Sequence, residues 1–381
     1  MNEQLITQIS DFVETSHAEE VSLLRTICQI PSPTRHEELR ARFISEWLRE
    51  VGVADIECDG LHNVCCLLGN PNASEILLFS AHIDVVFPDT DTLPLEQRDG
   101  LLYCPGIGDN TANVTGLLMA TRFWIAHPEL LPKDKGVLIA FNTCEEGLGN
   151  LDGIRAIFER YAGRIVEHVS FDLYLPQVIP CAVGSIREEI EVRTQGGHSW
   201  HDYGRPNAIH RLSTIICDLY ALELPHGATI NVGRIEGGTT INAIAERARA
   251  LVEFRSCADE DLSALRSALE AVASAHASDG VEVRLAVVGV RPGNGEVDER
   301  ALEAMTRRNA EIVSTVTGDD ADICCASTDA NIALSQGVRA NTIGTVTGAL
   351  LHTRAEWIDP TSLKAGLEVI LRVMCASWSD D

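Results

Sequence analysis

The sequence has few basic residues for its number of acidic ones. It contains 30 Lys and Arg against 56 Asp and Glu, which gives a formal net charge of −26 with His neutral. Such a charge repels the phosphate backbone of nucleic acids and the head groups of anionic lipids. We therefore expect no nucleic-acid or membrane partner, and we interpret most of the excess acid as a solvated surface.

Long apolar runs and disulfide-type cysteine spacings are also missing. No run approaches the roughly 20 apolar residues that span a bilayer. The opening MNEQLITQISDFVE lacks the basic start and apolar middle of a secretion signal. The 12 cysteines form no CxxC pair, and the vicinal pairs Cys65–Cys66 and Cys324–Cys325 lie in apolar segments. We therefore predict reduced, mostly buried thiols and a cytoplasmic location.

Three common catalytic signatures are absent from the chain. It has no HExxH helix, no GxSxG nucleophile turn and no GxxxxGK[ST] phosphate-binding loop. A dinuclear phosphoesterase could use oxygen and nitrogen donors without these motifs, but nothing in the sequence indicates a phosphate clamp. Any catalytic residues of this chain therefore belong to a different motif.

The chain is long enough for a large core and two domains, with 381 residues of which 45% are hydrophobic. Thr34 and Glu37 form a capping-box pattern that predicts a helix ending at Gly52. From residue 64 to about 180, continuously apolar segments such as ILLFSAHI and VLIAFN alternate with a helical stretch, ANVTGLLMATRFWIAHP. This alternation predicts an α/β layer structure whose strands are covered on both faces.

A second pattern occupies residues 184–292. Segments such as REEIEVRTQG and RARALVEFRS alternate polar and apolar residues, as strands with one solvated face do, and two helical segments lie between them. The order β-α-β-β-α-β is that of a ferredoxin-like unit. Because the α/β pattern returns after Pro292, we predict one domain from 1–183 and 293–381 with the 184–292 domain inserted into it.

Acids and histidines follow the apolar segments that we interpret as strands. Nitrogen and oxygen donors of this kind bind divalent metals of the zinc, cobalt and manganese group. Seven donors exceed the needs of one ion and suit a two-metal centre with a carboxylate left to move protons. The seven are His82, Asp84, Asp109, Glu145, Glu146, Asp172 and His352.

Each of these residues also has a structural interpretation when it is taken alone. At strand spacing His82 and Asp84 share a face, so Asp84 can hold the other ring nitrogen of His82 directly or through its backbone. Asp109 could be a helix N-cap. If their backbone is extended, Glu145 and Glu146 are expected to project to opposite sides. One would then face a metal and the other a metal-bound water. The alternative is that both are solvated side chains on a loop. The indication of function lies in the whole set.

In order and spacing, these segments resemble the M20-type dinuclear metallopeptidase and aminoacylase family, which includes tripeptidase-like aminopeptidases, succinyl-diaminopimelate desuccinylase and glutamate carboxypeptidase. The resemblance covers nearly the whole chain. It implies a zinc-peptidase-like catalytic domain, a mixed sheet flanked by helices, with an inserted ferredoxin-like α+β lid and dimerisation domain. It also implies that His82 and Asp172 bind one metal, that Glu146 and His352 bind the other, and that Asp109 bridges both.

The same resemblance implies roles for residues beyond the metal ligands. Glu145 matches the family's general base, and Asp84 matches the residue that orients the His82 ring. His198, in TQGGHSWHDYGRPNA, matches the residue that steadies the oxyanion in a neighbouring subunit's active site, although a local pair with His201 is the alternative. The bond from Asp109 to Asn110 is the candidate for the family's cis peptide.

Substrate contacts are implied for Asn242, Arg255 and Thr328, with Asp329 beside the last of them. Arg255 could clamp a carboxylate by two parallel hydrogen bonds, or it could simply pair with Glu253. Many relatives carry a lysine soon after the bridging aspartate, whereas this chain has DNTAN. Together with GGHSWHDYG and HTRAEW, this departure indicates the tripeptidase-like (peptidase T-like) branch. The segment SFDLYLPQV lacks the small residues that usually follow the ligand at the position of Asp172. The substrate specificity is therefore left open.

The sequence therefore predicts a cytoplasmic, homodimeric metallohydrolase with two divalent ions, zinc first and cobalt or manganese as alternatives. The predicted reaction is cleavage of an amide bond in a small peptide, as in an aminopeptidase or tripeptidase. An N-acyl amino acid deacylase or a carboxypeptidase on the same scaffold is the alternative. A non-catalytic metal-binding relative is a third possibility, and the presence of the base Glu145 argues against it.

Overall fold

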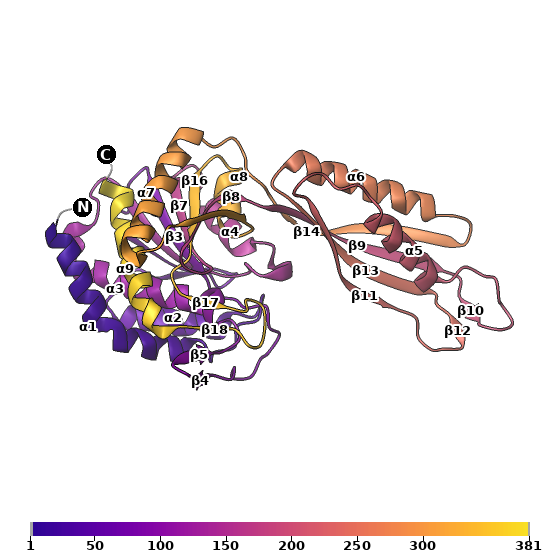
Figure 1. Ribbon diagram of the computed structural model, residues 1–381, viewed down its shortest axis with the longest axis horizontal. Helices are drawn as coiled ribbons and strands as arrows, with labels where there is room; N and C mark the ends of the chain where they lie inside the picture. Colours follow the sequence, from indigo (N-terminus) through magenta and orange to yellow (C-terminus); the bar gives the residue numbers. More distant parts are fainter. Residues whose placement is uncertain (1–2, 380–381) are drawn as a thin grey trace. The chain divides into compact units, whose positions relative to one another are not determined.

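The computed structural model describes residues 3–379 and divides into two compact units (Figure 1). The larger unit comprises the chain up to Ala182 and from Gly295 onward, and the smaller comprises Val183–Asn294. Within residues 3–379, no helix has the length and apolar character needed to cross a membrane. All 12 cysteines are free thiols.

An eight-stranded mixed sheet forms the centre of the larger unit, in the order β1-β2-β6-β3-β7-β16-β8-β15. At its middle, β6, β3 and β7 run parallel to one another. β3 and β6 are buried along their whole length, as continuously apolar segments predict. The strands are β1 (Glu57–Cys58), β2 (Val64–Gly69), β3 (Ile76–His82), β6 (Gly136–Asn142), β7 (Ile165–Phe171), β8 (Gln177–Ala182), β15 (Asp322–Ala326) and β16 (Arg339–Ile343).

Helices cover both faces of this sheet. Along β3, Leu77 and Phe79 join a core that includes side chains of α1, α2, α3, α7 and α9, whereas Ile76 and Leu78 pack into a second core with α4 and α8. The predicted mixed sheet flanked by helices is therefore confirmed. The helices are α1 (Glu3–Ile27), α2 (Glu38–Glu50), α3 (Asn113–Ala126), α4 (Asp152–Arg160), α7 (Glu299–Thr317), α8 (Ala330–Ser335) and α9 (Leu363–Ser379).

The start of α2 differs from the capping box that the sequence predicts. The helix begins at Glu38 with Glu37 as its N-cap residue, and no side chain caps it. Thr34 instead donates a hydrogen bond from Oγ1 to the Asp84 carboxylate, at 2.9 Å. Glu37 accepts from the backbone N–H of Arg35 and of Cys144, at 2.8 and 3.1 Å. The distant residues Asp84 and Cys144, together with the backbone of Arg35, therefore replace the predicted capping box.

A small second sheet in the larger unit carries a loop that the site uses. Its order is β17-β18-β5-β4, with β4 (Glu96–Arg98), β5 (Leu101–Tyr103), β17 (Gly348–Ala349) and β18 (Trp357–Ile358). His352 lies in the connection between β17 and β18. Arg354 in the same connection binds Asp89 through two hydrogen bonds, of 2.9 and 2.6 Å.

The smaller unit is a four-stranded antiparallel sheet in the order β11-β13-β9-β14. Its α5 and α6 pack on the apolar face, which carries Val192, Ala250 and Phe254. The predicted β-α-β-β-α-β order of a ferredoxin-like unit is confirmed, with a short additional pair, β10 and β12. The elements are β9 (Gly184–Thr194), β10 (Gly197–His198), α5 (Ala208–Tyr220), β11 (Thr229–Gly237), β12 (Ala243–Ile244), β13 (Arg247–Ser256), α6 (Asp259–His276) and β14 (Val281–Arg291).

A buried histidine in β7 makes the stability of the larger unit depend on pH. His168 is fully buried, its Nε2 lies 2.8 Å from the Ser80 hydroxyl, and burial lowers its pKa to about 3. Below pH 6.5 the unfolded chain therefore binds a proton that the folded chain excludes, so stability falls as the pH falls. Between pH 7 and pH 5, we expect the wild type to lose about 2 kcal/mol more than His168→Gln.

Urea unfolding followed by tryptophan fluorescence at the two pH values measures this difference. His226→Gln, at an exposed histidine, is the control and should lose stability in parallel with the wild type. Equal losses in the wild type and His168→Gln would contradict the assignment of His168 as a buried neutral imidazole.

Candidate metal centre

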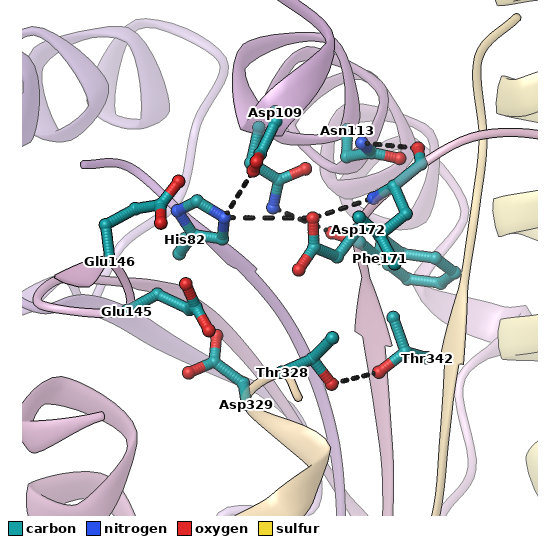
Figure 2. A network of polar contacts seen from close by, with 12 residues as sticks. His82, Asp109, Asn113, Glu145, Glu146, Phe171, Asp172, Thr328, Asp329 and Thr342 are labelled. Carbon is teal, nitrogen blue, oxygen red and sulfur yellow. Dashed lines mark hydrogen bonds and ion pairs between the residues drawn. The ribbon is translucent and has the colours of Figure 1, made fainter. Parts of the chain in front are cut away.

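The carboxyl ends of three neighbouring parallel strands bring most of the predicted donors to one edge of the sheet (Figure 2). His82 is the last residue of β3, Asp172 directly follows β7, and Glu145 and Glu146 lie a few residues beyond β6. Because β6, β3 and β7 are adjacent, their ends open at the same edge, where ligands of α/β sheets bind. All four side chains are buried.

Asp109 lies between the two histidines. Its Oδ1 is 3.0 Å from His82 Nε2, and its Oδ2 is 3.0 Å from His352 Nε2. It lies in the segment Ile107–Ala112, whose backbone departs from helical geometry at Asp109 and Asn110, and the peptide bond between these two residues is cis, as the resemblance implies. One carboxylate therefore offers one oxygen to each of two neighbouring groups of donors.

These two groups share Asp109. In the first, Asp172 Oδ1 lies 3.7 Å from His82 Nε2, and in the second, Glu146 Oε1 lies 3.2 Å from His352 Nε2. Donor atoms of His82, Asp109 and Asp172 all lie within 4.8 Å of one another, and so do those of Asp109, Glu146 and His352. The structure thus brings together all five residues that the sequence singled out as ligands.

Asp84 holds the backbone beneath this cluster. Its side chain is fully buried, and its two carboxylate oxygens accept from the backbone N–H groups of Glu145 and Glu146, at 3.0 and 2.9 Å. His82 Nδ1 lies 3.2 Å from the Asp84 carbonyl oxygen and 3.4 Å from its carboxylate. Asp84 thereby links the end of β3 to the segment after β6.

The two adjacent glutamates do not project to opposite sides as predicted. One donor atom from each of Glu145, Glu146 and His82 lies within 4.8 Å of the others, and Figure 2 shows both carboxylates directed toward the histidine. The pair lies beyond the end of β6 at Asn142, and the Asp84 carboxylate holds the backbone N–H groups of both residues, so the alternation of a paired strand does not govern them.

The electrostatics of this cluster fit a site for cations. Burial, followed by repulsion from Asp109, raises the pKa of Glu146 to about 8, and burial raises the pKa of Asp172 to about 6. Hydrogen bonds with Asp109 and Glu146 raise the pKa of His352 to about 11. Burial opposes a charge on His82, but Asp172 and Asp109 outweigh it and raise its pKa well above 6.5.

The raised pKa values of Glu146 and Asp172 mean that these two carboxylates are stable as anions only beside positive charge. Two divalent cations would supply that charge, and the donor set of two imidazoles and three carboxylates is one that zinc, cobalt and manganese accept. The chemistry of the residues therefore fits the two-metal centre that the sequence predicts.

Glu356 is a site residue that the sequence analysis missed. It is buried, and its carboxylate accepts from the backbone N–H groups of Gly106, Gly108 and Asp109, at 2.8–2.9 Å. Burial raises its pKa to about 7. Glu356 therefore fixes the loop that carries Asp109. In the sequence, Glu356 is marked only by its position four residues after the predicted ligand His352. That spacing alone does not predict a buried acid.

Asp329 lies beneath Glu145. Its side chain is buried, and Oδ2 accepts a hydrogen bond of 2.7 Å from the side chain of Asn142. Figure 2 shows its carboxyl group facing that of Glu145. Burial, followed by repulsion from Glu145, raises the pKa of Asp329 well above its usual value. Thr328, beside it, forms a hydrogen bond of 2.6 Å with the Thr342 hydroxyl.

The other predicted residues belong to the smaller unit. His198 and His201 have ring centroids 4.8 Å apart, and His198 Nδ1 accepts from the backbone N–H of Trp200 at 3.2 Å. Arg255 donates two hydrogen bonds to Glu253, of 2.8 and 3.2 Å, which is the simple pairing that the sequence left as an alternative. Asn242 is exposed, and its backbone carbonyl accepts a hydrogen bond of 3.0 Å from the backbone N–H of Ser199.

Comparison with known proteins links both units to peptidases. Residues 182–281 match the model of the peptidase dimerisation domain, and residues 63–170 match that of peptidase family M28. The chain is 25% identical over 304 residues to succinyl-diaminopimelate desuccinylase of Corynebacterium glutamicum, covering 75% of this chain and 80% of the relative. It is also 25% identical to acetylornithine deacetylase of Myxococcus xanthus over 324 residues, covering 80% and 81%.

Solved structures share the fold over almost the whole chain. Aminopeptidase PepT from Bacillus cereus superposes with a TM-score of 0.72 at 18% identity, covering 94% of this chain and 98% of that one. The dipeptidase Dug1p of Saccharomyces cerevisiae gives 0.76 at 14% identity, covering 99% of each chain. The YXEP protein of Bacillus subtilis, a dinuclear metal-binding peptidase of the M20 family, gives 0.68 at 15% identity, covering 97% and 100%.

In fold and in the residues of its site, the chain resembles enzymes of the metal-dependent peptidase and amidohydrolase class. Within that class, the predicted resemblance to the M20-type dinuclear metallopeptidases is confirmed by the dimerisation-domain match and by the solved structures that share the fold.

Proposed function

We propose that the protein is a two-metal hydrolase that cleaves an amide bond of small peptides, acting as an aminopeptidase or tripeptidase. The observation that carries this proposal is the position of Asp109, whose two oxygens each lie 3.0 Å from a different histidine. A carboxylate placed in this way can bridge two cations, and a paired site suits hydrolysis.

In this proposal, His82 and Asp172 hold one ion, Glu146 and His352 hold the other, and Asp109 joins both. Zinc is the first choice, because imidazole and carboxylate are its common ligands, and cobalt and manganese are the alternatives. When bound, the ions would lower the pKa of a water toward neutrality and polarise the scissile carbonyl.

Glu145 is the proposed general base. Its carboxylate lies at the donor cluster, within 4.8 Å of both the His82 and Glu146 donor atoms, and it is not needed for either group of three ligands. It would accept the proton of the attacking water and return it to the leaving amine. Asp84 would position Glu145, because it fixes the backbone N–H of this residue and of Glu146.

The smaller unit is proposed to act as a lid and as the interface of a homodimer, which the match to the peptidase dimerisation domain supports. His198, which is exposed, would stabilise the oxyanion in the site of a neighbouring copy. Asn242, Arg255 and Thr328 are the proposed substrate contacts, and Arg255 would have to exchange Glu253 for a substrate carboxylate. We also propose a cytoplasmic location, which the 12 free thiols favour.

The second candidate function is removal of an acyl group from an amino acid. The observation that favours it is the 25% identity to a desuccinylase and to a deacetylase, over about three quarters or more of this chain. Both candidates use the same metals and base, so they differ only in which end of the substrate is recognised.

An unblocked tripeptide and its N-acetylated twin separate these two functions. With protein reconstituted with zinc, cobalt or manganese, we expect release of the N-terminal residue from the unblocked peptide and at least about 100-fold slower cleavage of the acetylated one. The reason is that a site built to bind a free amine leaves its polar groups unpaired when that amine is blocked. Faster cleavage of the acetylated peptide would overturn the aminopeptidase assignment in favour of a deacylase or a carboxypeptidase.

A further inference from the structure

Two cysteines lie side by side at one edge of the eight-stranded sheet. β15 is the last strand of this sheet and pairs in parallel with β8. Cys325 in β15 is opposite Cys181 in β8, and their sulfur atoms lie within 4.8 Å of each other. Cys325 is exposed and Cys181 is half-buried, so an ion in solution can reach the pair. None of the proposed catalytic steps uses either residue.

An irregularity in the strand pairing brings these two residues opposite each other. Ile323 pairs with Val178, and a regular ladder would then place Cys325 opposite Pro180. The register instead shifts between Ile323 and Cys325, so that Cys181 takes the position opposite Cys325. Pro180 has no N–H to give to the ladder, and proline within a sheet is commonly found at a bulge. Because a bulge re-aims side chains, the local sequence VIPCA in β8 sets up the thiol pair.

The separation of the two sulfurs suits one metal ion between them. A zinc–thiolate bond is about 2.3 Å long, so two sulfurs bound at this length on opposite sides of an ion are about 4.6 Å apart. A smaller angle at the ion brings the sulfurs closer together. Since the sulfurs of Cys181 and Cys325 are at most 4.8 Å apart, both can reach one ion by small rotations of their side chains.

We propose that Cys181 and Cys325 form a binding site for a soft metal cation of the Cu(I) type. Thiolate ligands select soft ions such as Cu(I). Among the described residues of the larger unit, no third donor joins the pair. Cu(I) accepts two thiolates as its ligands, whereas structural zinc sites take four ligands. Binding forms two metal–sulfur bonds, and each thiol releases its proton to water.

The vicinal cysteines of the sequence do not form such a site by themselves. Successive residues of a strand point to opposite faces of a sheet, so Cys65 and Cys66 are poorly placed to share an ion, and so are Cys324 and Cys325. Cys65 and Cys66 are also buried. The thiol pair across the ladder differs from the candidate metal centre as well, because it offers sulfur alone in place of imidazole and carboxylate donors. The proposal therefore stands apart from the proposed hydrolysis.

Competition for Cu(I) tests the site without any activity measurement. The full chain, stripped of metal and kept reduced in the absence of oxygen, is titrated against Cu(I) held by a coloured chelator such as bathocuproine disulfonate. Cys325→Ser and Cys181→Ser should each weaken the tightest Cu(I) site by at least about 100-fold, more than the loss of a residue that only supports a ligand. Two control variants should keep the affinity of the wild type: Cys324→Ser, in the same strand, and Cys58→Ser, at an exposed thiol in β1.

X-ray absorption at the copper edge identifies the donors in the complex with one Cu(I) per chain. We expect sulfur neighbours only. Nitrogen or oxygen donors in this complex would overturn the proposal, and so would the affinity of the wild type in both Cys181→Ser and Cys325→Ser. If Cys181→Ser does not fold, Cys325→Ser decides alone, because its side chain is exposed. A chain that cleaves none of the amide substrates but binds Cu(I) through these thiols would contradict the proposed function and support the thiol site.

Discussion

Replacing Glu145 by Gln is expected to lower kcat about 10²–10⁴-fold while both metal ions stay bound. Gln keeps the size of the side chain but cannot accept a proton, so the loss measures general-base catalysis alone. The ligands Glu146, His82 and Asp109 are unchanged, and the backbone N–H of residue 145 keeps its bond to Asp84. Steady-state kinetics on the unblocked tripeptide and metal analysis of the same preparation are the measurements.

A matched control separates this effect from a loss of surface charge. Glu303 is an exposed glutamate on α7, and Glu303→Gln should have the kcat of the wild type. Unchanged turnover in Glu145→Gln would remove Glu145 from the role of base. Loss of metal in the same variant would make it a ligand instead.

Replacing Asp109 by Asn is expected to weaken the binding of both metal ions by more than about 100-fold. The Asp109 carboxylate offers one charged oxygen to each group of donors, whereas an amide offers a single neutral oxygen and cannot bridge. Changing residues that only support a ligand already costs about 10–100-fold in metal affinity, so loss of the bridge itself should exceed this range. Calorimetric titration of the metal-free protein with zinc measures both sites.

Asp172→Asn is the comparison for that prediction. Asp172 belongs to the group of donors that contains His82 and not to the group that contains His352, so this change should weaken one site and leave the other intact. An Asp109→Asn protein that still binds two ions with the affinity of the wild type would show that Asp109 does not bridge. Equal damage from the two variants would show that the donors form a single group.

The donors at the strand ends could be predicted because their signal is local. Continuously apolar segments placed His82 and Asp172 at the ends of β3 and β7, and the parallel arrangement of α/β proteins brought these ends to one edge. The ferredoxin-like order of the smaller unit could be predicted for the same reason, since each of its strands alternates polar and apolar residues. The family resemblance supplied what local pattern lacked, above all the inclusion of His352, which lies in a connection between two short strands.

The remaining features depend on contacts between distant segments. Thr34 has the sequence pattern of a helix cap, but its hydroxyl donates a hydrogen bond to the carboxylate of Asp84, 50 residues later. The backbone N–H groups of Glu145 and Glu146 bind the Asp84 carboxylate, 61 and 62 residues earlier in the chain. Glu356 reaches the Asp109 loop across 247 residues. In each case the partner exists only once the sheet has formed.

Titration of turnover with metal tests the central claim most directly. Protein stripped by a chelator should not cleave the unblocked tripeptide, and its activity should rise with added zinc, cobalt or manganese to a maximum near two ions per chain. This result is predicted because Asp109 shares its oxygens between two groups of donors. Full activity in the stripped protein, or a maximum reached with one ion and unchanged by a second that binds, would contradict the two-metal account.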